Sequence, residues 1–327
     1  MILAGDIGGT NTRLALVEAA DAELKMVAEM IFPSRERVSL ESVVAEFLSL
    51  HPCDLTRASF GIAGPVRNGR CEATNLPWVV DAKNVAKRLR LQHVGLINDL
   101  EANAYGIAIL QNKDLVILNK GARNATGNRA IISAGTGLGE AGLYWDGQVH
   151  RPFATEGGHT DFAPRNHLEM EVLTYCLSHY RRVSYERLVS GPGLVQIYNF
   201  LRDAGKAEEP SWLAEEMRHG DPAPIISQHG LDGKSPLCSQ ALEMFVSLYG
   251  AEAGNLALKL MATGGVYLGG GIAPKIIAKL KEPVFMNAFT AKGRMRPLLQ
   301  DMPVKVIMNP KTALLGAARH AALDLEK

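Results

Sequence analysis

The sequence predicts an α/β protein built from two similar halves. Two glycine-threonine turns, at residues 8–12 and 135–139, each lie between two apolar runs, and they are about 125 residues apart. With 327 residues, the chain is longer than a single hydrophobic core usually covers, so two domains are the expected arrangement. We therefore expect two α/β halves that face each other across a cleft.

The first turn has the residue types of a phosphate-binding loop. Gly8 and Gly9 lack a Cβ, so the turn is free to adopt positive φ and to bring its amide hydrogens close to a phosphate oxygen. Thr10 and Asn11 add side-chain donors. An ordinary glycine hairpin would explain the glycines alone, but the polar residues, together with Asp6 just before the turn, favour phosphate.

Asp6 is the candidate magnesium ligand. It lies on the strand before the turn and could hold Mg²⁺ directly or through water, because magnesium prefers one or two carboxylates plus phosphate oxygens. The turn is not a Walker A loop, because no lysine follows the glycines and the next segment has β character.

The second turn nearly repeats the first. Its Gly137, Gly139 and Gly142 formally match the dinucleotide fingerprint, which requires a helix directly after the strand. The chain continues instead with a hairpin signal at Asp146 and the glycine after it. A nicotinamide site, and with it an NAD-dependent dehydrogenase, is therefore the weaker interpretation. A nucleotide lying between the two halves is the stronger one.

Between the two turns, an apolar run ends in Asn98-Asp99, where a strand is expected to give way to a helix. Such a pair is often only a helix N-cap. Ligands of open α/β sheets, however, bind at the carboxyl ends of strands. There Asp99 could accept the proton of an alcohol that attacks the terminal phosphate of a nucleotide.

Further polar residues follow the second turn. Glu156 and His159 place a carboxylate and an imidazole on one glycine turn, a mixture of acceptor and donor that suits sugar hydroxyls. A metal site at His159 and Asp161 would lack a clear third ligand, and a structural histidine is the plainer alternative. Glu186, expected on a helix, would by itself be an ordinary surface charge.

A last glycine cluster, at residues 264–271, predicts a strand, a turn and a helix with Pro274 near its first turn. Glycines there would let the chain pass close to a flat adenine and ribose, although a tight strand-to-helix connection explains them equally well. The remaining expected elements follow from apolar periodicity and turn residues. Strands are expected at 2–7, 12–18, 24–32, 58–63, 94–98, 115–119, 130–134 and 304–308, and helices at 39–50, 82–90, 100–110, 167–180, 184–203, 211–218, 236–262 and 312 to about 325. The closing strand and helix are expected to pack onto the first domain.

Composition narrows the function classes. Apolar residues make up 47% of the chain and charged residues 21%, as in a globular enzyme or binding protein, and the net charge of +1 predicts neither nucleic-acid nor membrane partners. Asp6 and the glycines interrupt the first apolar run, which predicts no signal peptide, and no segment is long enough to span a bilayer. The widely spaced cysteines fit reduced thiols of a cytoplasmic protein. They are Cys53, Cys71, Cys176 and Cys238.

In order and spacing over essentially the whole chain, these motifs resemble the bacterial glucokinases, of the superfamily that also contains actin and the heat-shock ATPases. The motifs are Gly5-Asp6-Ile7-Gly8-Gly9-Thr10-Asn11, Ile97-Asn98-Asp99, Ser133-Ala134-Gly135-Thr136-Gly137-Leu138-Gly139, Glu156-Gly157-Gly158-His159 and Leu268-Gly269-Gly270-Gly271. The resemblance implies two ribonuclease-H-like (actin-like ATPase) domains flanking a cleft, the larger with extra helices, and a homodimer. The small domain would comprise residues 1–109 plus 301–327 and the large one 110–300, with closure at the junctions near 109 and 300.

The resemblance also implies a reaction, in which ATP and D-glucose give glucose 6-phosphate and ADP. Asp99 would be the general base at the 6-hydroxyl. Asn98, Glu156, His159 and Glu186 would bind the other hydroxyls, and Gly5, Asp6, Ile7, Gly8, Gly9, Thr10, Asn11, Thr136, Gly137 and Gly270 would contact the nucleotide.

Two alternatives share most of these residues: a kinase for another hexose or an N-acetylated amino sugar, and a sugar-responsive binding protein without turnover, which would have no use for Asp99. The chain departs from the related repressor-type kinases, whose cysteine-rich zinc motif follows the Glu-x-Gly-His segment, because residues 160–180 hold only Cys176. Neither structural zinc nor a DNA-binding helix-turn-helix before Met1 is expected.

Overall fold

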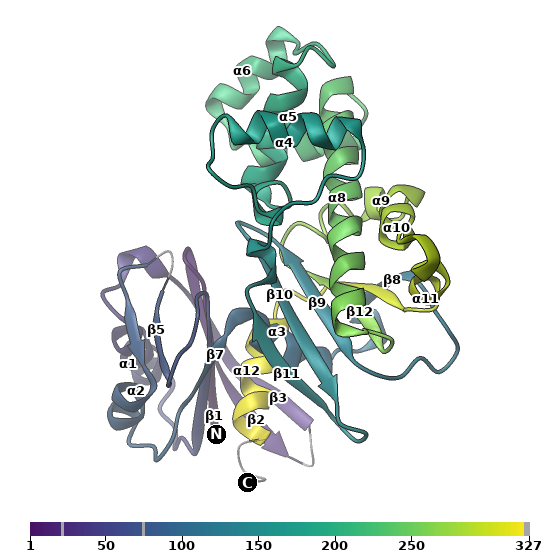
Figure 1. The fold of residues 1–327 in the computed structure, drawn as a ribbon. Helices are drawn as coiled ribbons and strands as arrows, with labels where there is room; N and C mark the ends of the chain where they lie inside the picture. The colour runs from purple at the N-terminus through teal and green to yellow at the C-terminus, as the bar shows by residue number, and fades with distance from the viewer. Residues whose placement is uncertain (21–22, 74–75, 324–327) are drawn as a thin grey trace. The chain divides into compact units, whose positions relative to one another are not determined.

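The structure is a computed structural model that describes residues 1–20, 23–73 and 76–323. The chain forms two compact units, each with a mixed sheet and helices (Figure 1). Unit 1 comprises Met1–Asp114, Arg151–Ala154 and Asn309–Lys327, and unit 2 comprises Leu115–His150 and Thr155–Met308.

The described residues of unit 1 contain a five-stranded sheet in the order β3-β2-β1-β4-β7. Strand β2 is antiparallel to both β3 and β1, whereas β4 and β7 run parallel to β1. A separate hairpin, β5-β6, follows β4. These strands are β1 (Ile2–Ile7), β2 (Asn11–Ala20), β3 (Glu23–Pro33), β4 (Arg57–Ile62), β5 (Arg70–Glu72), β6 (Val79–Asp81) and β7 (Gly95–Asn98).

The second sheet repeats this pattern. Over the described part of the chain it has six strands in the order β11-β10-β9-β12-β13-β8, with β9 antiparallel to β10 and parallel to β12, as β1 is to β2 and β4. The internal similarity expected from the two turns is thus confirmed at the level of strand order. The strands are β8 (Leu115–Asn119), β9 (Arg129–Ala134), β10 (Leu138–Trp145), β11 (His150–Thr155), β12 (Gly265–Gly269) and β13 (Val304–Ile307).

The helices of unit 1 cover both faces of its sheet. Helix α12 lies along the sheet next to α3, where Gly316 has room for no side chain because an added Cβ would lie 1.7 Å from the carbonyl oxygen of Ala102. Phe32, Phe47 and Phe60 fill the core on the side of α1. The helices are α1 (Leu40–Leu50), α2 (Ala82–Leu89), α3 (Asp99–Ile107) and α12 (Thr312–Leu323), with 3-10 turns η1 (Ser34–Glu36) and η2 (Asn112–Asp114).

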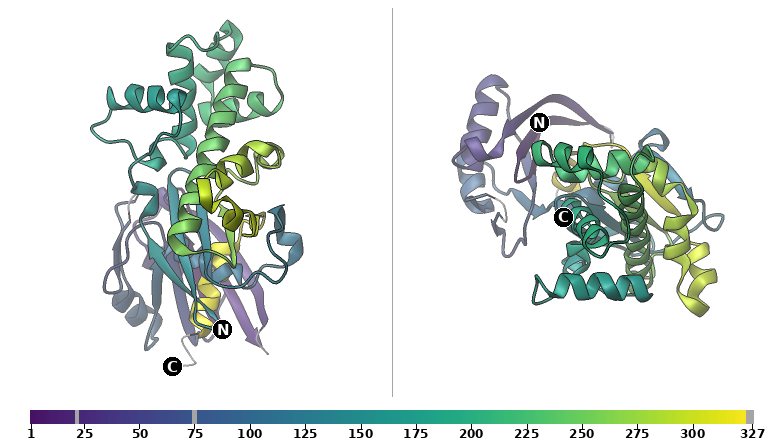
Figure 2. Two further views of the ribbon diagram at one scale, coloured as in Figure 1. Left: turned by 45° about the vertical axis from the view of Figure 1, so that its right-hand side comes forward. Right: turned by 90° about the horizontal axis from the view of Figure 1, so that it is seen from above.

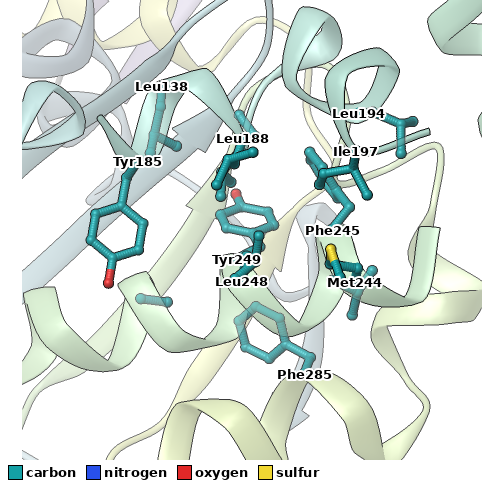
Figure 3. Packing of buried hydrophobic residues seen from close by; sticks show 14 of the residues in the cluster. Leu138, Tyr185, Leu188, Leu194, Ile197, Met244, Phe245, Leu248, Tyr249 and Phe285 are labelled. Carbon is teal, nitrogen blue, oxygen red and sulfur yellow. The ribbon is translucent and has the colours of Figure 1, made fainter. Parts of the chain in front are cut away.

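Unit 2 carries the extra helices expected of the larger half. The long helix α8 runs along the sheet, and α5 and α7 pack against it (Figure 2). Tyr249 of α8 lies between Leu188 and Phe285 in the core, and its hydroxyl donates to the carbonyl of Ile132 at 3.1 Å (Figure 3). The helices are α4 (His167–Leu177), α5 (Gly191–Asp203), α6 (Ser211–His219), α7 (Pro222–Leu231), α8 (Pro236–Leu260), α9 (Ile277–Leu280), α10 (Pro283–Thr290) and α11 (Arg296–Gln300), with 3-10 turns η3 (Gly157–His159), η4 (Tyr185–Arg187) and η5 (Gly293–Met295).

Several expected elements are corrected. The helix expected at 184–203 divides into η4 and α5, because Ser190 caps α5 through the amide of Gly193 at 3.1 Å. The helix expected after the last glycine cluster begins only at Ile277. Helices α7 and α10, each with a proline in its first turn, were not expected at all.

The closing strand does not join the first sheet as expected. Strand β13 pairs with β12 and β8 in the second sheet. Of the closing strand and helix, it is the helix, α12, that packs against β1 and α3. The expected end of the last helix, near residue 325, lies outside the described residues. The domain division at 1–109 plus 301–327 and 110–300 stays a prediction.

The four cysteines are free, and all but Cys53 are buried. Among the described residues, no helix combines the length and the apolar character needed to cross a bilayer.

Candidate functional site

The first glycine turn joins β1 to β2 and is held by hydrogen bonds on both sides. The amide of Gly8 donates to the carbonyl of Asn11 at 3.0 Å. Ser34, from η1, donates its hydroxyl to the Gly8 carbonyl at 2.8 Å and its amide to the Thr10 carbonyl at 2.9 Å. The buried hydroxyl of Thr12 lies 2.9 Å from the Ser34 hydroxyl. The turn is therefore fixed before any ligand arrives.

The expected positive φ is not used at this turn. Neither Gly8 nor Gly9 has the left-handed backbone conformation. The need for glycine at position 8 is spatial, because an added Cβ would lie 3.2 Å from the carbonyl oxygen of Asn11. The expected approach of the turn amides to a phosphate oxygen stays a prediction.

Ser34 is a site residue that the sequence analysis missed. We expect Ser34→Ala to lower the free energy of unfolding by about 1–3 kcal/mol and to weaken ATP binding, because it leaves the buried hydroxyl of Thr12 and the Gly8 carbonyl without this partner. Urea unfolding and titration with ATP measure the two effects. Ser49→Ala is the matched control, since the exposed Ser49 makes a single bond to the Glu46 carbonyl. Equal losses in the two variants would contradict the bracing role.

Asp6 lies beside Arg13, its neighbour across the β1-β2 pairing. Burial raises the pKa of the Asp6 carboxyl, and the Arg13 cation opposes this rise. Arg13 is also engaged elsewhere, with Glu29 at 3.6 Å and the Pro310 carbonyl at 3.2 Å. Among the described residues, no group of three or more His, Cys, Asp or Glu side chains could hold a metal ion by itself. One desolvated carboxylate fits a Mg²⁺ ion whose other ligands are phosphate oxygens and water.

Asn98 and Asp99 lie at the same edge of the sheet as the first turn. Ile7, Ile62 and Asn98 form one row across the parallel strands β1, β4 and β7, so the turn and Asn98 are separated by two strand spacings, or about 10 Å. Gly61, on the middle strand, leaves room for α3, since an added Cβ would lie 2.7 Å from Cβ of Ala102. The topology thus brings the two predicted site segments of unit 1 together.

The capping alternative applies to Asn98. Its Oδ1 accepts from the amide of Leu100 at 2.9 Å, and its Nδ2 donates to the Gly64 carbonyl at 3.1 Å. Asp99 is the first residue of α3 and is half-buried, and its Oδ1 lies 3.0 Å from the same Leu100 amide. Burial first, and then the Asp99 carboxylate, raise the pKa of the Cys71 thiol to about 11, which places Cys71 in the electrostatic range of Asp99.

In unit 2, His159 lies between two carboxylates. Its Nε2 is 4.0 Å from Oε2 of Glu156, and its Nδ1 is 3.7 Å from Oε1 of Glu186. The His159 side chain is 54% exposed, so it is not a core histidine. Asp161 accepts from Arg182 at 2.8 Å, which weighs against the alternative of a metal held by His159 and Asp161. Three predicted sugar-binding residues are therefore brought together.

The second glycine turn contacts this cluster through Glu186. The amide of Leu138 donates to Oε2 of Glu186 at 3.0 Å, and a Cβ added to Gly137 would lie 2.5 Å from that oxygen. Glu186 lies on the 3-10 turn η4 and not on the expected helix. Beside it is a hollow of about 90 Å³ that Thr136 and Ser190 help to line. As expected, the turn continues into the strand β10 in place of a helix. The dinucleotide fingerprint therefore has no structural basis here.

Gly270 lies at the same sheet edge, directly after β12. It has a φ of +79°, and an added Cβ would lie 2.3 Å from the carbonyl oxygen of Ala134. The amide of Ile272 donates to that same carbonyl at 3.3 Å. The last glycine cluster is thus in contact with the strand that leads into the second turn, and glycine is required at this position by both conformation and space.

Two sheets of matching strand order, each with a glycine turn at the carboxyl ends of its parallel strands, are the arrangement expected of the actin-like ATPase fold. A sequence model described as Glucokinase matches residues 3–324. A glucokinase from Trichormus variabilis is 44% identical, and the match covers 98% of this chain and 99% of the relative. The chain belongs to the glucokinase family, so the resemblance seen in the sequence is confirmed.

Solved structures agree with this assignment. The crystal structure of a glucokinase from an Antarctic psychrotroph superposes with a TM-score of 0.86 at 31% identity and 98% coverage of both chains. A ROK family glucokinase from Streptomyces griseus, solved in complex with glucose and AMPPNP, has a TM-score of 0.67 at 20% identity, covering 98% of this chain and 99% of that one. The second similarity concerns the fold alone. The fold class expected from the sequence is confirmed.

Proposed function

We propose that this protein transfers the γ-phosphoryl group of ATP to the 6-hydroxyl of D-glucose, giving glucose 6-phosphate and ADP. The observation that carries the proposal is the cluster of Glu156, His159 and Glu186 in direct contact with the second glycine turn. Carboxylates and an imidazole suit the hydroxyls of a sugar, while glycine-turn amides suit phosphate oxygens. Membership in the glucokinase family supports the same reaction.

Asp99 acts as the general base in this proposal. Its carboxylate accepts the proton of the 6-hydroxyl while that oxygen forms its bond to the γ-phosphorus and the bond to ADP breaks. Asn98 binds a neighbouring hydroxyl. Its carboxamide has already used one hydrogen and one lone pair on Gly64 and Leu100, which leaves one donor and one acceptor position for the sugar.

The other hydroxyls are bound by Glu156, His159 and Glu186. Because Oε2 of Glu186 already accepts from Leu138, its Oε1 is the oxygen left for the sugar, on the side of His159. Positioning of the alcohol contributes as much as the base, since a well-oriented intramolecular reaction gains about 7 kcal/mol or more.

The family resemblance implies that the nucleotide is bound by three glycine segments of the chain. These are Gly5, Ile7, Gly8, Gly9, Thr10 and Asn11 with Asp6 in unit 1, and Thr136, Gly137 and Gly270 in unit 2. Asp6 would hold Mg²⁺ directly or through water, and the bound ion would supply positive charge at the phosphate oxygens.

We further propose a cytoplasmic homodimer without nucleic-acid or membrane partners. The free thiols of all four cysteines support a reducing compartment. The dimer follows from the family resemblance. Sedimentation equilibrium of the purified protein measures it, and a mass of one chain at micromolar concentration would contradict it.

The function is tested by assaying sugars in parallel with ATP. We expect the highest kcat/KM with glucose in a coupled assay that contains glucose, mannose, fructose and N-acetylglucosamine as separate substrates. A higher kcat/KM with another hexose or with N-acetylglucosamine would favour the alternative kinase, which uses the same 6-hydroxyl chemistry. Sugar binding without ADP release for any substrate would indicate a binding protein and contradict the proposal.

A further inference from the structure

Two buried carboxylates face each other beneath the loop that carries Glu156. Glu140, on β10, is 1% exposed, and Glu252, on α8, is fully buried. Among the described residues, Oε1 of each carboxyl is a buried oxygen without a hydrogen-bond partner, and Nζ of Lys259 lies 3.6 Å from Oε1 of Glu252 as an ion pair. Two such groups cannot both be ionised without a large desolvation penalty, so a proton held by the pair is the state that fits the packing. The reaction proposed above uses neither residue.

Glu140 touches the backbone of the sugar-binding loop. A Cβ built on Gly157 would lie 1.9 Å from Oε2 of Glu140, so the glycine next to Glu156 lies directly against this carboxyl. The loop is tied to the same strand position by a second route. Thr155 donates its hydroxyl to the Glu140 carbonyl at 3.0 Å and accepts from the Gly157 amide at 3.2 Å. The main chain on either side of Glu156 therefore lies against residue 140, at Gly157 through the Glu140 carboxyl and at Thr155 through the Glu140 main-chain carbonyl.

Glu252 reaches the segment that carries Glu186. Its Oε2 accepts from Nδ2 of Asn255 at 2.8 Å, and the same nitrogen lies 3.0 Å from the hydroxyl of Tyr185. Tyr185 directly precedes Glu186, and its amide donates to the Thr160 carbonyl at 3.1 Å, just after His159. The carboxyl pair thus supports both sugar-binding segments from below.

We propose that Glu140 is a positioning residue for sugar binding, whose protonated carboxyl holds the Glu156–His159 loop in place and whose ionisation releases it. The proposal rests on the function proposed for Glu156 and His159. An ionised Glu140 would repel the Glu252 carboxylate inside the core. The loop backbone at Gly157 is partly exposed to water, so the loop is the part of this contact that is released. Sugar affinity, and not ATP affinity, should then fall when Glu140 loses its proton.

The charges around Glu140 help to determine the pH at which its carboxyl loses its proton. Burial, followed by the Glu252 carboxylate, raises the pKa of Glu140 to about 8. Burial also lowers the pKa of Lys292 to about 8, so that this cation loses its charge in the same range. The titratable and charged groups facing the pair are Tyr249 and Lys259 from α8, Tyr185 from η4 and Lys292 after α10, and Arg165 and Glu169 lie beyond Lys292.

The test is the pH profile of KM for glucose in Glu140→Gln, which keeps the shape of the protonated carboxyl but cannot ionise. We expect KM for glucose to rise about tenfold in the unsubstituted protein between pH 7 and 9, as one unit of pH above the pKa leaves about a tenth of the group protonated. KM for ATP should stay constant. In Glu140→Gln the rise should be less than twofold, whereas Glu140→Ala should have a raised KM for glucose at every pH. Glu243→Gln, an exposed glutamate of α8, is the control and should keep the unsubstituted profile.

A rise that persists in Glu140→Gln would belong to Lys292, which this variant retains, and would overturn the proposal. So would an unchanged KM for glucose in Glu140→Ala. Should Glu140→Gln not fold, Glu252→Gln replaces it. Removal of the neighbouring charge should move the rise to lower pH, and an unmoved rise would contradict the pairing.

Stability separates this proposal from the proposed function. The pKa of Glu140 is higher in the folded than in the unfolded protein. The contribution of Glu140 to the free energy of unfolding should therefore be greatest below pH 4.5 and decline as the pH rises to about 8. Thermal unfolding should show this decline in the unsubstituted protein and less of it in Glu140→Gln. If glucose is not phosphorylated but the two proteins differ in the pH dependence of thermal unfolding, the proposed function is wrong and the protonated Glu140–Glu252 pair is supported. If glucose is phosphorylated and the difference is absent, only the proposal on Glu140 fails.

Discussion

Asp99→Asn is expected to lower kcat for glucose phosphorylation about a thousandfold while leaving glucose affinity within about threefold, because it removes the proton acceptor and keeps the shape of the side chain. The amide oxygen of asparagine can still accept from Leu100, as Oδ1 of Asp99 does at 3.0 Å, so helix α3 should begin where it does now. The coupled assay measures kcat, and calorimetric titration with glucose measures binding.

Glu101→Gln is the matched control, because it makes the same carboxyl-to-amide change two residues further along α3. Burial raises the pKa of Glu101, so the protein environment at the start of α3 acts on this carboxyl as well. We expect its kcat to stay within about twofold of the unsubstituted value. A similar loss in both variants would mean that the charge of the segment matters and that Asp99 is no specific base. Full activity of Asp99→Asn would reduce Asp99 to a capping residue.

Gly270→Ala is expected to have the largest effect on folding stability among the glycine positions of the site. A side chain at a φ of +79° is strained, and the added Cβ would lie 2.3 Å from the Ala134 carbonyl, which is main chain and cannot turn away. We expect the free energy of unfolding to fall by about 2–4 kcal/mol, from backbone strain together with overpacking. KM for ATP should rise as the turn and β9 move apart. Urea unfolding and steady-state kinetics measure the two changes.

The next residue supplies the control. Gly271 has no φ in the left-handed region, and a Cβ added there would meet nothing within 4 Å. Gly271→Ala should therefore change the free energy of unfolding by less than about 1 kcal/mol. Equal destabilisation by the two substitutions would show that the contact with Ala134 does not determine the requirement at position 270.

The fold was predictable wherever local pattern decides structure. Apolar runs bounded by glycines gave the strands on either side of both turns, and Asn98 and Asp81 are found at the helix starts that their residue types predict. The prolines that begin α7 and α10 are a helix-start signal that lies in the sequence itself. The other features that were not predicted depend on contacts between residues that are far apart in the sequence.

Ser34 and Glu140 show why part of the site could not be predicted. Ser34 follows the turn that it braces by more than twenty residues, and nothing in its neighbours marks it. Glu140 stands in a glycine-rich strand where a carboxylate would normally face water, and it is buried against Glu252 of α8 and the loop at Gly157. Burial of a charge by a distant helix leaves no trace in local spacing. Family resemblance suggested candidate site residues, but not the groups that contact them.

The bond from the Leu138 amide to Glu186 links the binding of the two proposed substrates. One carboxylate is shared by the segment proposed to hold the sugar and the segment proposed to hold the nucleotide. A hydroxyl that draws Glu186 towards itself must also pull on the main chain of the phosphate loop. By thermodynamic reciprocity, whichever substrate enters first then alters the affinity for the second by the same factor in both directions.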